Sequence, residues 1–222
     1  MSKKEKTTSI LLEPLLLYLV LFFPGLGGFG DGANTGTIPF SAIRELSQTL
    51  HYTLPALALI WYLILKKKSL SFSPGKLKPD RKDAYSFLFG FPGLILIGAG
   101  ISLIITRLSL SSPQELQGPY NIPGWITLIF SCLGTGYLEE SYFRYYLLRK
   151  LEERVSKIPR VIFSVLLFAL CHAYEGPWGI LNAALAGLLL SFLFERCRSL
   201  HGIALAHACY NALVYALGNY GL

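Results

Sequence analysis

Charged residues are scarce in this chain of 222 residues, because Asp, Glu, Lys and Arg make up 15% of it and hydrophobic residues 53%. A soluble domain carries about 25% charged residues, so the deficit excludes an ordinary soluble protein and predicts a membrane protein. The chain also lacks any C-x-x-C pair, internal repeat or low-complexity tract. Its four cysteines are Cys132, Cys171, Cys197 and Cys209. Neither a disulfide framework nor a thiolate metal site is therefore indicated.

Long apolar stretches, by contrast, recur along the whole chain. A membrane-spanning helix needs roughly 17 to 25 mainly apolar residues, and seven stretches of about this length occur here. They are Ile10–Leu26, Thr49–Leu65, Ala84–Thr106, Ile122–Leu148, Pro159–Tyr174, Pro177–Phe194 and Leu200–Leu217. No small-x-small cleavage site follows the first stretch, so we expect a retained helix rather than a signal peptide. The predicted fold is all-α, a polytopic membrane helical bundle of about seven transmembrane helices.

The basic residues predict how this bundle is oriented. All of the 20 Lys and Arg residues except Arg44, Arg107 and Arg144 lie before the first stretch or after the second, fourth and sixth. By the positive-inside rule the N-terminus is cytoplasmic. The formal charge of +7 is then a topology signal, and we expect a lipid bilayer rather than a nucleic acid as partner. Residues 31–48 are expected to form an outer loop with room for a short interfacial helix.

A few ionisable residues interrupt the apolar stretches. Each costs at least about 2.5–3.5 kcal/mol at the centre of a membrane, so each is a candidate for a functional site. They are Glu139, Glu140, Arg144, His172 and His207, with Asn182 and Asn211 as uncharged companions. From the helical rise of about 1.5 Å per residue, Glu139, His172 and His207 lie about 14–18 Å from the cytoplasmic ends of three different helices. Their common depth predicts one shared polar site.

The spacing of the charged residues in the fourth stretch suggests two different roles. Glu140 and Arg144 are four residues apart, so they face the same way and are expected to form a structural ion pair. Glu139 points about 100° away from Glu140 and is free to face a cavity. Glu139 is therefore the better candidate for a working carboxylate, and burial would raise its basicity toward the range of a general base.

The histidines fit the same chemistry. His207 and Asn211 are four residues apart and together suit two donors aimed at a developing oxyanion. His172 is placed to hold the water that Glu139 deprotonates. Three other interpretations remain open. In the first, the polar residues only hold helices together. In the second, Cys171 or Cys209 is a minor candidate for a thiol nucleophile, and in the third, Glu139 and His172 relay protons in a transporter.

Three short motifs occur in order on successive predicted helices. They are Glu139-Glu140-Ser141-Tyr142-Phe143-Arg144, Phe168-Ala169-Leu170-Cys171-His172 and His207-Ala208-Cys209-Tyr210-Asn211. The set resembles the E-E-x-x-x-R, F-x-x-x-H and H-x-x-x-N signature of the CPBP (Abi) family of intramembrane proteases, which includes type II CAAX prenyl proteases and bacteriocin-processing or self-immunity proteins. The resemblance covers residues 122–222, which we interpret as the protease core. Residues 1–121 contribute further transmembrane helices and loops without a specific motif.

The resemblance implies an integral membrane endopeptidase, in a prokaryotic cytoplasmic membrane, that cuts a membrane-associated or lipidated protein or peptide near its end. Glu139 and His172 would activate water, His207 and Asn211 would form the oxyanion hole, and Glu140 and Arg144 would support the site. A non-catalytic scaffold or self-immunity protein of the same fold is the alternative. We expect no cofactor. If zinc were used, Glu139, His172 and His207 would be its ligands, although the H-E-x-x-H arrangement is missing.

Overall fold

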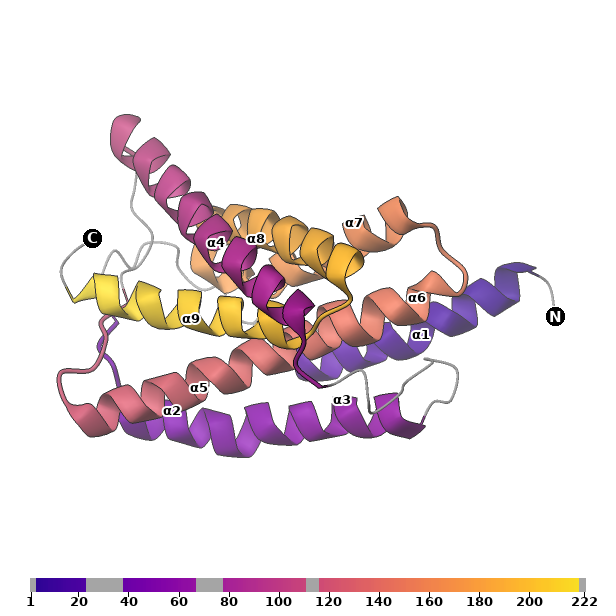
Figure 1. Ribbon diagram of the computed structural model, residues 1–222, viewed down its shortest axis with the longest axis horizontal. Coiled ribbons are helices and arrows are strands. Elements are labelled where there is room, and N and C mark those ends of the chain that lie inside the picture. The colour runs from indigo at the N-terminus through magenta and orange to yellow at the C-terminus, as the bar shows by residue number, and fades with distance from the viewer. Residues whose placement is uncertain (1–2, 23–37, 67–77, 111–115, 220–222) are drawn as a thin grey trace.

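The computed structural model describes residues 3–22, 38–66, 78–110 and 116–219, and their regular secondary structure is helical apart from one isolated bridge between Ile38 and Leu116. The all-α prediction is confirmed for these residues (Figure 1). The α-helices are α1 (Lys3–Leu21), α2 (Ala42–Gln48), α3 (Leu54–Lys66), α4 (Arg81–Arg107), α5 (Ile122–Glu140), α6 (Arg149–Glu152), α7 (Lys157–Leu170), α8 (Gly176–Cys197) and α9 (His201–Gly218). Two π-helical segments, η2 (Thr49–Thr53) and η5 (Ser141–Leu148), and the 3-10 turn η6 (Ala173–Glu175) complete the set.

The two π-helical segments join neighbouring helices into continuous rods. Through η2, α2 continues into α3, and through η5, α5 continues into α6. The second helix therefore begins at Ala42 rather than at Thr49, and the short helix for which the predicted outer loop left room lies at residues 42–48 and continues into it. The physical reason is a helix cap, because the side chain of Ser41 accepts a hydrogen bond from the backbone of Arg44. The part of that loop at residues 31–37 lies outside the described residues.

Three of the helical segments are long and apolar enough to cross a membrane: Ala42–Lys66, Arg81–Arg107 and Ala173–Cys197. The first predicted stretch, Ile10–Leu26, overlaps α1, which begins earlier, at Lys3, and ends at Leu21; residues 23–26 lie outside the described part. Large apolar side chains of α4, such as Leu88, Phe89 and Leu96, point outward. Such faces suit contact with lipid, which supports an integral membrane protein, while a bundle that crosses seven times stays a prediction.

Charged side chains at the ends of α6, α7 and α8 meet one another. Arg160 forms an ion pair of 2.9 Å with Glu195, and Arg198 forms one of 2.6 Å with Glu152. These residues belong to the connections that the positive-inside rule assigns to the cytoplasm. The structure thus gathers two of the basic connections, residues 149–160 and 196–198, at one end of the bundle, while the side of the membrane on which this end lies stays a prediction.

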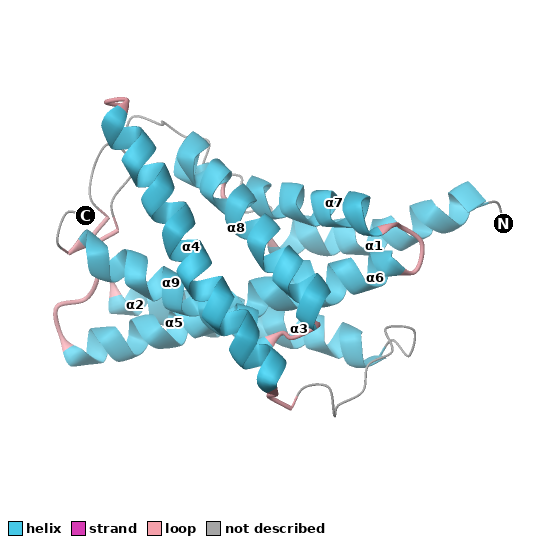
Figure 2. Cartoon of the chain, turned by 45° about the horizontal axis from the view of Figure 1, so that its top comes forward, coloured by secondary structure: helices cyan, strands magenta, loops and turns pink. Residues whose placement is uncertain are grey.

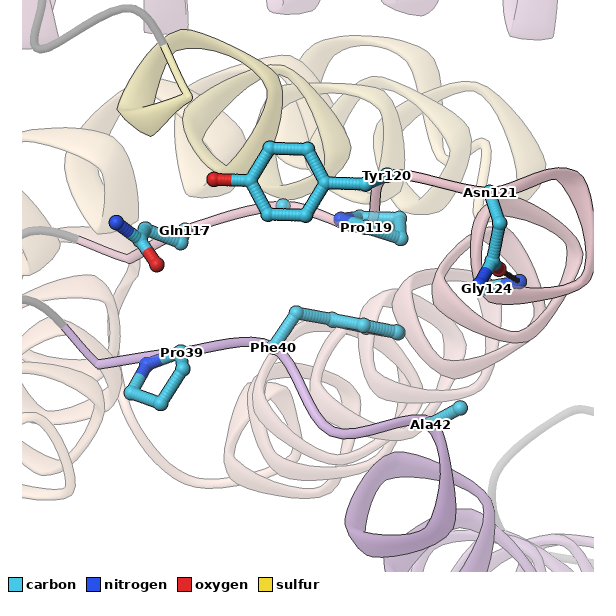
Figure 3. A pocket seen from close by; sticks show the side chains of 9 residues that line it. Pro39, Phe40, Ala42, Gln117, Pro119, Tyr120, Asn121 and Gly124 are labelled. Atoms are coloured by element: carbon cyan, nitrogen blue, oxygen red, sulfur yellow. Dashed lines mark hydrogen bonds between the residues drawn. The ribbon is translucent and has the colours of Figure 1, made fainter.

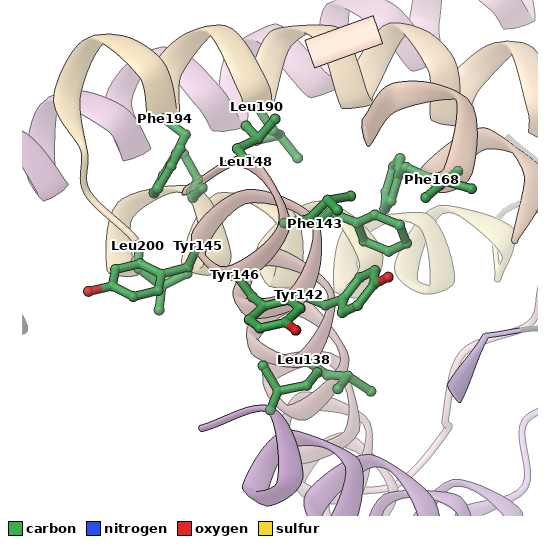
Figure 4. Packing of buried hydrophobic residues seen from close by; sticks show 14 of the residues in the cluster. Leu138, Tyr142, Phe143, Tyr145, Tyr146, Leu148, Phe168, Leu190, Phe194 and Leu200 are labelled. Atoms are coloured by element: carbon green, nitrogen blue, oxygen red, sulfur yellow. The ribbon is translucent and has the colours of Figure 1, made fainter. Parts of the chain in front are cut away.

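The core is built around the aromatic segment η5, whose eight residues are all buried (Figure 4). The hydroxyl of Tyr142 donates to the Pro14 carbonyl at 2.6 Å, and that of Tyr18 donates to the Leu167 carbonyl at 3.0 Å, so α1 is bound to the centre of the fold. On the other side, α4 lies against α8 and α9 (Figure 2). At Gly136 of α5, an added Cβ would approach the Ala204 carbonyl of α9 to 2.7 Å, so glycine permits this close packing.

Candidate active site

Glu140, the last residue of α5, is completely buried and has two partners on the same oxygen. Its Oε1 accepts hydrogen bonds from Arg144 Nη1 at 3.0 Å and from His207 Nδ1 at 2.9 Å. The ion pair with Arg144 is the one that the i, i+4 spacing predicts. The bond to His207 of α9 was not predicted, because sequence spacing says nothing about which side chain of another helix lies opposite. Glu140 therefore links the first and third motifs directly.

Arg144 is buried among apolar and aromatic groups, yet its charge is compensated. Its guanidinium lies 4.3 Å from the centre of the Phe168 ring, and Nη2 donates to the Gly187 carbonyl at 3.3 Å. A Cβ at Gly187 would stand 3.4 Å from Nη2 and 3.1 Å from Phe168, so glycine lets α8 come this close. A buried charge needs such partners because desolvation costs several kcal/mol per ion.

Glu139 faces the second nitrogen of the same imidazole. Its Oε2 lies 3.6 Å from His207 Nε2, which is too long for a direct hydrogen bond. This oxygen is buried and has no hydrogen-bond partner in the structure. The two neighbouring carboxylates thus approach opposite nitrogens of His207: Oε1 of Glu140 is bonded to Arg144 and His207, whereas Oε2 of both glutamates is buried without a hydrogen-bond partner among the described residues. The predicted difference in orientation between the two glutamates agrees with this geometry.

His172 follows the C-terminal end of α7 and reaches the cluster through Phe168. Its Nδ1 lies 2.8 Å from the Phe168 carbonyl, and because a carbonyl only accepts, Nδ1 carries the proton and Nε2 is left as a base. The ring of Phe168 lies 4.7 Å from that of His172 and 5.9 Å from that of His207. Among the described residues, no hydrogen bond or ion pair joins His172 directly to Glu139.

Phe168 is the central residue that the interpretation of single polar groups missed. Its ring touches both histidines, the Arg144 guanidinium and the ring of Phe143. The available signal was its place as the first residue of the F-x-x-x-H motif, one helical turn before His172. An aromatic residue in this position fixes the spacing between the imidazoles without competing for their hydrogen bonds.

The two asparagines that accompany the charged residues are Asn211 on α9 and Asn182 on α8. Asn211 is half-buried on α9, one turn after His207, as predicted. Asn182 of α8 forms a side-chain hydrogen bond with Tyr210, which precedes Asn211, and its Oδ1 is buried without a partner. The structure therefore brings Glu139, Glu140, Arg144 and His207 into one cluster, adds His172 through Phe168, and leaves Asn211 at its edge.

The cysteines and the possible metal ligands near the cluster do not form a second reactive site in the described part of the chain. Cys171 is buried, and its Sγ donates to the Phe168 carbonyl at 3.0 Å, whereas Cys209 is exposed. Over the described part of the chain, no group of three or more His, Cys, Asp or Glu side chains is placed to hold a metal ion. In the described residues, the donor set Glu139, His172 and His207 is therefore not arranged as a zinc site.

A separate cavity of about 240 Å³ lies near the start of α5, between the segments that precede α2 and α5 (Figure 3). Pro39, Phe40 and Tyr120 line it, together with Asn121, the residue that caps α5. None of the predicted site residues lines this cavity. Glu139 lies near the opposite end of α5, so the cavity and the charged cluster are distinct features.

The fold and the cluster define a class: a helical membrane protein with a buried site of carboxylates and imidazoles. The family model described as type II CAAX prenyl endopeptidase Rce1-like matches residues 121–213. This segment contains every predicted site residue, so the match confirms the resemblance seen in the three motifs, and the similarity implies a protease activity. No curated protein and no solved structure matches the chain.

Proposed function

We propose that the protein is an intramembrane endopeptidase in which Glu139 activates the hydrolytic water. The observation that carries this proposal is the buried, unpaired Oε2 of Glu139, 3.6 Å from His207 Nε2. A buried carboxylate oxygen without a donor is costly, and a water molecule would supply the missing hydrogen bond. A water that donates a hydrogen bond to this oxygen would also stand beside Glu139, the group that takes its proton.

The reaction follows from these groups. Glu139 takes a proton from the water while the oxygen of that water attacks the carbonyl carbon of the scissile peptide bond. His172 Nε2, left as an acceptor by the bond from Nδ1 to Phe168, orients the water. The negative charge that develops on the carbonyl oxygen is stabilised by Asn211 and by His207, whose Nε2 donates when the imidazole carries a proton on both nitrogens. When the C–N bond breaks, Glu139 returns the proton to the leaving amine, which yields a carboxylic acid and an amine.

Glu140 and Arg144 act on His207 rather than on the substrate. The hydrogen bond from His207 Nδ1 to Glu140 fixes the ring orientation and directs Nε2 toward Glu139 and the reacting groups. Arg144 balances the charge of Glu140 where both side chains are fully buried. These two residues therefore position the imidazole, and neither needs to touch the substrate.

The surroundings indicate the kind of substrate. Helices with outward apolar faces place the cluster where a lipid-anchored or membrane-associated chain end would arrive by lateral diffusion. The family description, type II CAAX prenyl endopeptidase, fits a scissile bond close to a lipidated terminus. We propose cleavage near such an end, without a metal, by an enzyme of a prokaryotic cytoplasmic membrane.

The decisive experiment compares the termini of membrane proteins in cells that carry either the wild-type protein or Glu139→Gln. New or lost termini that depend on Glu139 would identify the substrate and test catalysis together. Glu153→Gln, an exposed carboxylate substitution, is the matched control. If the two variants gave the same termini as the wild type, the chain would act as a scaffold instead.

A further inference from the structure

The helix α2–η2–α3 has a buried face that changes character halfway along. Toward the start of the rod its buried residues are Glu45, Thr49 and Thr53, and toward the end they are Ala56, Ile60 and Ile64. The first three are polar and the last three apolar. In a helix that packs inside a membrane protein, an apolar face needs no explanation, whereas a buried carboxylate with two buried hydroxyls does.

The polar half of this face packs on α5. Ser131 donates to Glu45 Oε2 at 2.9 Å, and a Cβ added at Gly134 would stand 3.1 Å from the Cγ2 methyl of Thr53, so the two helices pack closely here. On α5, Ser131, Thr135 and Glu139 follow one another at intervals of four residues and therefore share a face. We call the polar residues between the two helices, Glu45, Thr49 and Thr53 with Ser131 and Thr135, the polar seam.

The polar seam reaches from the surface to the active site. At its outer end, Arg44 Nη2 lies 3.6 Å from Glu45 Oε1, and the side chain of Arg44 is 47% exposed. At its inner end, Glu139 follows Ser131 and Thr135 on the same face of α5, and its Oε2 is buried without a hydrogen-bond partner among the described residues. Ser131 and Glu139 are eight residues apart, so the seam is about 12 Å long. Beyond Thr53, toward the other end of the rod, the buried face is apolar.

We infer that the polar seam is the route by which water reaches Glu139 from the end of the bundle where α2 and α5 begin. Hydroxyl groups one helical turn apart stand about 5–6 Å from one another, too far for a direct hydrogen bond and suitable for one bridging water. The hydroxyl of Ser131 donates to the Glu45 carboxylate, and the hydroxyl of Thr49 donates to the Glu45 backbone carbonyl. Each hydroxyl oxygen keeps its lone pairs and can still accept a hydrogen bond. The seam therefore offers acceptors at successive turns.

This inference rests on the proposed function, because each hydrolysis consumes one water at a site surrounded by apolar helices. It also explains why the polar residues stop at Thr53, since a route is needed only as far as Glu139. Glu45 escaped the interpretation of the sequence because it was assigned to an outer loop, where a carboxylate is ordinary. Its burial against Ser131 is what reveals the seam.

Pulsed X-ray radiolysis tests whether the seam is wet, because hydroxyl radicals then form from water in place. A single cysteine would be introduced as Thr53→Cys or as Ile60→Cys into full-length protein whose four native cysteines are replaced by alanine. We expect the thiol at position 53 to oxidise several-fold faster than the one at position 60, which lies on the same helix face in the apolar half. Equal or slower oxidation at position 53 would overturn the inference.

Kinetics provide the second measurement. Thr49→Val and Thr53→Val together preserve the shape of the side chains and remove both hydroxyls, and we expect kcat to fall about tenfold at unchanged KM, as when a reactant is no longer positioned. Thr106→Val, the same change at an exposed position of α4 away from the seam, should leave kcat unaltered. An unchanged kcat in the double variant would contradict the route. Radiolysis does not depend on activity, so a failure of the proposed protease function is distinguishable from a dry seam.

Discussion

The hydrogen bond of 2.9 Å from His207 Nδ1 to Glu140 Oε1 connects helices α9 and α5 at the centre of the charged cluster. It fixes which nitrogen of His207 faces Glu139. Two glutamates that are adjacent in the sequence therefore serve one imidazole in different ways. The predictions below separate the contribution of each.

Glu139→Gln is expected to lower kcat by about 10²–10⁴-fold, the usual contribution of a general base, because the amide cannot accept the proton of water. The side chain keeps its size, and Glu140, Arg144 and His207 keep their contacts, so the thermal unfolding temperature in detergent should stay close to that of the wild type. Cleavage kinetics on the purified protein provide the measurement. A variant that folds and retains the wild-type kcat would contradict the assignment of Glu139.

Glu140→Ala is expected to destabilise the fold by about 3–5 kcal/mol, because it leaves the buried guanidinium of Arg144 without its counter-ion. Removing both charges in Glu140→Leu with Arg144→Met should cost much less than Glu140→Ala alone. Equilibrium unfolding in detergent mixtures would measure both effects. If the double variant were the less stable one, the role of Glu140 as counter-ion would be wrong.

Phe168→Leu is expected to lower kcat by about 10–100-fold with little change in KM, because the ring that spaces His172 and His207 is lost and the imidazoles shift. Phe192→Leu, the same substitution at an exposed position of α8, is the matched control. Steady-state kinetics on the two variants would decide. Equal kcat values would show that Phe168 only fills space.

The ion pair between Glu152 and Arg198 predicts a dependence of stability on pH. The hydrogen bond from Arg198 lowers the pKa of the Glu152 carboxyl below its ordinary value in the folded protein. A lowered pKa contributes stability above the pKa of the unfolded chain, and this contribution is lost as the pH falls through the pKa of the folded state.

The stability gap between the wild type and Glu152→Gln should therefore be present at neutral pH and close in acid. Since Glu152 is largely exposed, the gap should be modest. Thermal unfolding across this pH range, with Glu153→Gln as control, would measure it. A gap that widened as the pH fell would reverse the assigned sign.

Treatment with a strong chelator is expected to leave the cleavage rate unchanged, because the proposed chemistry uses only side chains and water. Elemental analysis of the purified protein should then show far less than one zinc per chain. Loss of activity that added zinc restores would instead establish a metal-dependent mechanism.

The helices and most of the site were predictable because both depend on patterns within single segments. Apolar length locates a helix, and i, i+4 spacing places Glu140 beside Arg144 and His207 beside Asn211. Depth along each helix also indicated that Glu139 and His207 share one level, and the structure places them together.

What the sequence could not provide depends on the rotation of one helix against another. The bond between Glu140 and His207, the ring of Phe168 between two histidines, and the burial of Glu45 against Ser131 all arise between helices. Hydropathy also misplaced the start of the second helix, since the polar residues 42–48 resemble a loop until the Ser41 cap is seen. The mean hydropathy of a segment does not reveal that part of the buried face of its helix is polar.

The interval from Ser131 to Glu139 sets a constraint on the length of α5. Ser131 must face Glu45 and Glu139 must face His207, and these two partners belong to different helices. Because each residue turns a helix by about 100°, a single insertion or deletion within the interval would break one of these contacts whichever one it preserved. A change of length in this part of α5 would therefore disturb the site even where every side chain is kept.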